Sequence, residues 1–114
     1  MNTENNKIIA DFLGYETIVG ITVVSVVKNN QLMVFDPNSD WNWLMEVVEK
    51  IEKTRRSQWS KYTFACVKIS SFGCDIIFYG NRKEIISDIV RPSKIEAVYD
   101  ACVKFIKWHN QQNY

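Results

Sequence analysis

The chain has 114 residues, 46% of them apolar and 13% aromatic, and a net charge of +1 at pH 7. This is enough apolar surface for one core, so the values predict a single domain over 1–114 and exclude a disordered chain. No apolar run approaches the roughly 20 residues that cross a bilayer, and the near-neutral charge is not that of a dedicated binder of long nucleic acids.

The first elements indicate a helix followed by a β-hairpin. Residues 5–13 fit a short helix that ends at Gly14, since glycine best tolerates the left-handed closing turn. Residues 17–27 are rich in β-branched side chains and predict a strand. The turn sequence KNNQ and the strand LMVF follow, so 17–35 is expected to form a hairpin.

A second helix is predicted over 40–53, with Ser39 or Asp40 as its N-cap. On a helical wheel Trp41 falls at the centre of the apolar face, whereas Trp43 falls at its rim. We therefore expect Trp41 in the core. The other apolar residues of this face are Leu44, Met45, Val47, Val48 and Ile51.

The rest of the chain predicts two strands at 61–70 and 74–79 and a closing helix at 93–110. The helix begins with the S-x-x-E spacing of a capping box, Ser93 and Glu96. Residues 83–90 fit either a fifth strand or an irregular edge. The expected fold class is α+β, with an antiparallel sheet of four or five strands packed by helices in a layered sandwich.

His109 is the only histidine, and it lies at the end of the apolar stripe of the last helix. This place favours a partly covered histidine over a general base or a metal ligand. Asp75 and Asp88 are interpreted as isolated surface or edge acids, so neither catalysis, a cofactor nor a metal is expected. The three cysteines form no CxxC pair and are expected to be reduced thiols: Cys66, Cys74 and Cys102.

The best candidates for ligand contacts lie in RRSQWSKY at 55–62. Guanidinium groups can pair with phosphate oxygens, and an indole can stack on a base. These candidates are Arg55, Arg56, Trp59 and Lys61. The alternative is a solvated loop between a helix and a strand.

Two rim tryptophans, Trp43 and Trp108, are candidate interface residues, with simple edge packing as the alternative. The charge is also uneven, because residues 1–49 carry a net charge of −5 and residues 50–114 one of +6. This asymmetry is compatible with a small anionic partner or with a homo-oligomer formed through opposite patches.

DWNWLMEVVEKIE (40–52) and SKIEAVYDACVKFIKWHN (93–110) resemble segments of small proteins of phages and Bacteroides-type mobile elements, of the phage ABA sandwich type. The resemblance implies helix/sheet/helix layering and a phage or prophage origin. The expected function is non-enzymatic binding in the cytoplasm of a bacterial host, as an anti-defence or regulatory factor that sequesters a nucleotide signal or holds a host protein. The alternative is a self-assembling module with no ligand.

Overall fold

The computed structural model describes residues 2–53, 64–79 and 84–111. Within them, a helix and three strands are followed by a helix, three more strands and a closing helix. In chain order these elements are α1 (Thr3–Leu13), β1 (Glu16–Val19), β2 (Val24–Lys28), β3 (Gln31–Val34), α2 (Trp41–Glu52), β4 (Phe64–Ile69), β5 (Gly73–Tyr79), β6 (Glu84–Val90) and α3 (Lys94–Asn110).

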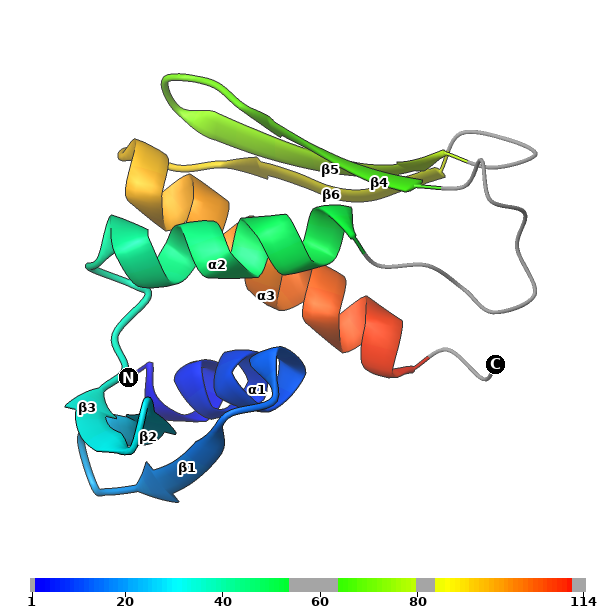
Figure 1. Cartoon of the computed structure of the whole chain (residues 1–114). Helices are drawn as coiled ribbons and strands as arrows, with labels where there is room; N and C mark the ends of the chain where they lie inside the picture. The colour runs from blue at the N-terminus through cyan, green and yellow to red at the C-terminus, as the bar shows by residue number, and fades with distance from the viewer. Residues whose placement is uncertain (1, 54–63, 80–83, 112–114) are drawn as a thin grey trace.

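The strands form two separate antiparallel sheets, β4-β5-β6 and β1-β2-β3. We call them the large and the small sheet. Both α2 and α3 lie on one face of the large sheet, and the small sheet lies with α1 on the far side of these helices (Figure 1). The layers therefore run from the large sheet through α2 and α3 to α1 and the small sheet.

The layered α+β class is confirmed, but the single sheet of four or five strands is wrong. Each sheet pairs only strands that are neighbours in the sequence, and α2 separates the two groups. The layering also differs from helix/sheet/helix, because the helices lie between the sheets (Figure 1). Of the segment 83–90, left open above, residues 84–90 form the third strand of the large sheet, and residue 83 lies outside the described residues.

The predicted strand at 17–27 is two strands, because the chain reverses at residues 20–23, where the Gly20 amide donates to Val23 O at 2.8 Å. The expected turn at KNNQ is confirmed. Asn29 and Asn30 have φ angles of 53° and 63°, as a type I′ hairpin turn requires, and asparagine tolerates this left-handed region better than most residues. Residues 16–34 thus form a meander of three strands.

The helix ends follow the sequence signals. Gly14 closes α1 with a φ of 84°, a value that a residue with a Cβ adopts only with strain. The Asp40 side chain accepts a hydrogen bond from the Asn42 amide, and Ser93 Oγ accepts one from the Glu96 amide. These caps satisfy backbone donors that have no partner within the helix.

The two tryptophans of α2 have the opposite burial from that predicted. Trp43 is 6% exposed, whereas Trp41 is 38% exposed, so the core position of Trp41 and the rim position of Trp43 are both wrong. The cause is the middle-layer position of α2. A helix covered by a sheet on one side and by α1 and the small sheet on the other buries a wider arc than the wheel assigns, while Trp41 stands at its first turn.

Candidate binding surface

The small sheet has one face toward the core and one face that no described residue covers. Val24 and Val26 are buried beneath α1. Because side chains alternate along a strand, their neighbours in β2 point the other way. The strand register places Ile18, Ser25 and Val34 in one outer row, and Glu16, Val27 and Leu32 in the next. We call this surface the outer face.

The outer face is largely apolar and largely exposed. Ile18 is 57% exposed, Leu32 61% and Val34 55%. Four more exposed apolar side chains lie in the same sheet region but not in the rows of the outer face. Val19 and Met33 stand in register with Val24 and Val26, and Ile21 and Val23 lie at the chain reversal. Soluble monomers seldom gather apolar side chains in this way unless the surface meets a partner.

A cluster of Tyr15, Lys28 and Glu46 attaches the small sheet to α2. Tyr15 Oη donates to Glu46 Oε1, and Lys28 Nζ donates to Glu46 Oε2 at 2.8 Å. Burial, and then the Glu46 carboxylate, raise the pKa of Tyr15, while the hydrogen bond to Glu46 raises that of Lys28. Both groups therefore keep their protons at neutral pH, and the phenol stays a donor.

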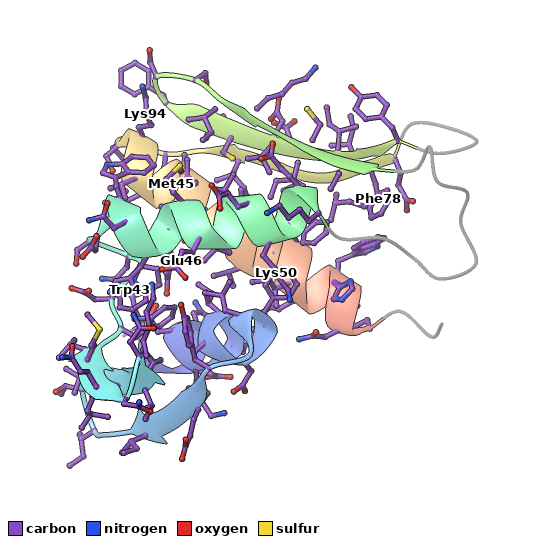
Figure 2. The ribbon with its side chains drawn as sticks, in the orientation of Figure 1. Trp43, Met45, Glu46, Lys50, Phe78 and Lys94 are labelled. Carbon is purple, nitrogen blue, oxygen red and sulfur yellow. The ribbon has the colours of Figure 1, made fainter. Side chains whose placement is uncertain are left out.

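Aromatic rings surround this cluster. Trp43 meets Phe35 edge to face at 5.0 Å and Tyr15 at 5.9 Å, and Lys28 Nζ lies 5.0 Å from the centre of the Trp43 ring. Figure 2 shows Trp43 and Glu46 on the side of α2 that faces the small sheet. Aromatic and cation–π contacts of this kind add to area burial. These contacts therefore attach the core-facing side of the small sheet to α2.

A buried amide joins α1 to α3 and to the loop before α2. Tyr99 Oη donates to Asn6 Oδ1 at 2.7 Å, and Asn6 Nδ2 donates to Asn38 Oδ1 at 3.0 Å. Burial raises the pKa of Tyr99, so its hydroxyl stays protonated. Asn6 also lines an open cleft of about 360 Å³ between α1 and the small sheet, where the buried Thr3 Oγ1 has no hydrogen-bond partner among the described residues.

The four predicted ligand contacts, Arg55, Arg56, Trp59 and Lys61, lie outside the described residues. Of the predicted interface residues, Trp43 is buried within the chain and offers little surface to a partner. Trp108 is half-buried, and its ring centre lies 5.8 Å from that of Phe78 and 5.6 Å from that of Phe105. Its rim position is therefore confirmed. Its interface role stays a prediction.

His109 occupies the partly covered position expected of it. Its ring stacks on Phe105 at 6.1 Å and meets Phe12 edge to face at 5.7 Å. Burial, and then the positive charge of Lys50, lower its pKa, so the neutral imidazole is favoured in the folded protein. These contacts give the side chain a packing role between α1 and α3.

The sequence suggested that Asp75 and Asp88 are isolated acids. They are instead register partners on β5 and β6. Lys68 stands opposite Asp75 on the other side, so an opposite charge balances the row. Arg91 Nε likewise donates to Asp100 Oδ2 at 2.7 Å. In the described ranges, no group of three or more histidine, cysteine or acidic side chains is placed to hold a metal ion.

The three cysteines form no disulfide, and two are buried. Cys74 and Cys102 lie in the core, and Cys66 is partly covered. Burial, and then the charge of Asp75, raise the pKa of Cys74 to about 12, and burial also raises that of Cys102. Since the thiolate is the reactive form, these two thiols are inert at neutral pH.

No family model, no curated protein and no solved structure matches this chain. Among the described residues, no helix is long and apolar enough to cross a membrane.

The outer face was missed from sequence, although a signal was present. An exposed strand with one buried face alternates apolar and polar residues. Here IV, VV, VV and LMV are apolar at successive positions, at 18–19, 23–24, 26–27 and 32–34. This excess was interpreted as strand propensity, but it also places apolar side chains on the second face.

Proposed function

We propose that this protein is a non-enzymatic accessory protein of a phage or prophage that acts by binding in the cytoplasm of a bacterial host. Its partner is a host protein held against the outer face, and the role is anti-defence or regulatory. The mobile-element origin rests on the resemblance of 40–52 and 93–110. The binding role rests on the exposed apolar side chains gathered on the outer face.

The chemistry of the outer face favours a protein partner over a nucleotide. A nucleotide needs cationic donors and a stacking platform, whereas the exposed side chains of this face include Ile18 on β1 and Leu32 and Val34 on β3. Exposed apolar side chains gathered on one surface are typical of a site that meets a protein partner. The nucleotide hypothesis still depends on Arg55, Arg56, Trp59 and Lys61, which the structure does not describe.

A matched pair of substitutions tests the proposal. Ile18→Lys places a charge on the outer face, while Ile85→Lys changes the same residue type at 61% exposure on β6 of the large sheet. Tagged wild type and both variants are expressed in the bacterial host. Each protein recovered with wild type is then purified and titrated against all three by calorimetry.

We expect Ile18→Lys to weaken the reconstituted complex at least tenfold, because a charged ammonium group would replace an apolar contact and lose its hydration when the partner binds. Ile85→Lys should bind as wild type does. Equal binding by Ile18→Lys and wild type would show that the outer face is not the docking surface. Recovery of a bound nucleotide with no protein partner would favour sequestration instead.

A further inference from the structure

The outer edge of β3 differs from the other sheet edges of the described chain. The strand orders leave four edges, formed by β1, β3, β4 and β6. Soluble proteins protect such edges with charged side chains, prolines or bulges, because an open edge can pair with another strand. β1 carries Glu16, β4 carries Lys68, and β6 carries two acids and pairs with β5 through a shift in register.

β3 has none of these protections. Its four residues, Gln31–Val34, are uncharged, and all four are exposed. It pairs with β2 on one side, and no described strand lies on its other side. This edge therefore presents a short run of free backbone donors and acceptors beside apolar side chains.

The ladder with β2 determines which backbone groups of β3 point outward. The amide of Phe35 donates to Val24 O at 2.7 Å. In an antiparallel pair, residues alternate between bonding the neighbouring strand and pointing away from it. Phe35 and Met33 thus bond β2, while Leu32 and Val34 direct N–H and C=O groups away from the sheet.

We infer that a second copy of this chain pairs with β3, strand to strand and antiparallel, about a two-fold axis at Met33. In this register Leu32 of each copy faces Val34 of the other copy, so there are two such pairs. Each of these two pairs exchanges two N–H···O=C bonds, so every outward group of Leu32 and Val34 is satisfied. The result is one six-stranded sheet.

The register is self-complementary in charge and in side-chain direction. A two-fold axis perpendicular to the sheet keeps both outer faces on one side, so Leu32 and Val34 of the two copies pack against each other. Asp36 falls opposite Asn30 of the second copy, and no like charges meet. An isologous contact of this kind closes as a dimer. The outer faces then form one apolar platform of double width.

The pair is expected to be weak and concentration-dependent, since a contact of one short strand lies well below the ~800 Å² per partner of stable interfaces. Sedimentation velocity over a concentration series should show the mass rising from 13.4 kDa toward twice that value. Val34→Pro should raise the dissociation constant at least tenfold. Proline removes an outward N–H and leaves the bonds to β2 in place.

Ile18→Lys is the matched control, because Ile18 lies in the same sheet but on β1, away from the pairing edge. The dimer rests on the proposed function, because it gives the same sheet a second partner. The dimer and the host complex can nevertheless be disproved separately. Val34→Pro breaks the dimer, whereas Ile18→Lys should leave the dimer intact and weaken only the host complex. Wild type that stays monomeric, or Val34→Pro that pairs as well as wild type, overturns the inference.

A cysteine substitution keeps the test valid if Val34→Pro fails to fold. Met33→Cys would bring two thiols together across the axis, where opposed Cα atoms lie about 4.5 Å apart in a pair without hydrogen bonds, within the range of a disulfide. Mild oxidation should convert it to a covalent dimer at least ten times faster than Ile18→Cys or wild type. Equal rates for Met33→Cys and Ile18→Cys would overturn the inference.

Discussion

The two sheets have the same three-stranded antiparallel topology but different surroundings. The large sheet packs one face on α2 and α3 and protects its edges with charged side chains and a shift in register. The small sheet is covered by α1 on one side, exposes an apolar face on the other, and ends in an edge without protection. The comparison indicates that the large sheet supports the fold and that the small sheet is available for contacts.

The largest test of this comparison replaces one apolar side chain in each region. Phe105 is fully buried beneath the large sheet and stacks on Phe78, so Phe105→Ala should lower the free energy of unfolding by about 3–5 kcal/mol. Leu32→Ala on the small sheet should change it by less than about 0.5 kcal/mol, because Leu32 is already mostly in solvent.

Urea denaturation with matched m-values measures both free energies. A loss at Leu32 comparable to that at Phe105 would mean that the outer face is covered within one chain. The small sheet would then be part of the core, and the contrast between the two sheets would disappear.

The next test concerns the attachment of the small sheet to α2. Glu46→Gln weakens the hydrogen bonds from Tyr15 and Lys28, and we expect a loss of about 1 kcal/mol, since charged hydrogen bonds in partly exposed sites lie at the lower end of their range. Glu49→Gln, an exposed change one turn along the same helix, is the control.

Amide hydrogen exchange localises this effect. Glu46→Gln should speed exchange at β2 more than at β5, because the two sheets are attached to α2 through different contacts. Equal acceleration in both sheets would show that they unfold as one unit, and no acceleration at β2 would show that the cluster contributes nothing to the attachment.

Local chemistry made much of the fold predictable. Gly14, Asp40 and Ser93 mark helix ends through backbone preferences and caps, and the turn at Asn29 and Asn30 follows from the tolerance of asparagine for positive φ. Each of these signals depends on neighbours within a few residues. The sequence alone therefore shows them.

The division into two sheets was not predictable in the same way. Strand propensity at 17–35 and 61–90 does not say whether the two groups share one sheet, since that choice depends on how α2 packs between them. The same unknown placement reversed Trp41 and Trp43. The outer face and the β3 edge are likewise products of tertiary arrangement. The candidate site was therefore missed, although β3 was predicted and β1 and β2 were predicted as one strand over 17–27.

The smallest expected effect is a pH dependence at His109, which lies where α1 meets α3. Burial and Lys50 lower its pKa in the folded protein below the usual 6.5, so the unfolded chain binds a proton more readily. The stability of wild type should therefore be unaffected by this group above about pH 6.5 and should fall as the pH drops through 6.5 toward the folded-state pKa.

His109→Gln removes that titration. The free energy of unfolding, measured at pH 7.5 and at pH 5.5, should fall less in the variant than in wild type, and Lys50→Gln should give an intermediate difference because one of the two causes is gone. A pH dependence that is identical in wild type and His109→Gln would assign the effect to other groups.

Partner binding by His109→Gln at pH 7.5 should be unchanged, since His109 packs against Phe12 and Phe105 and lies on no surface of the small sheet. A hundredfold loss of binding in folded His109→Gln would instead place the binding surface at the α1–α3 contact rather than on the small sheet.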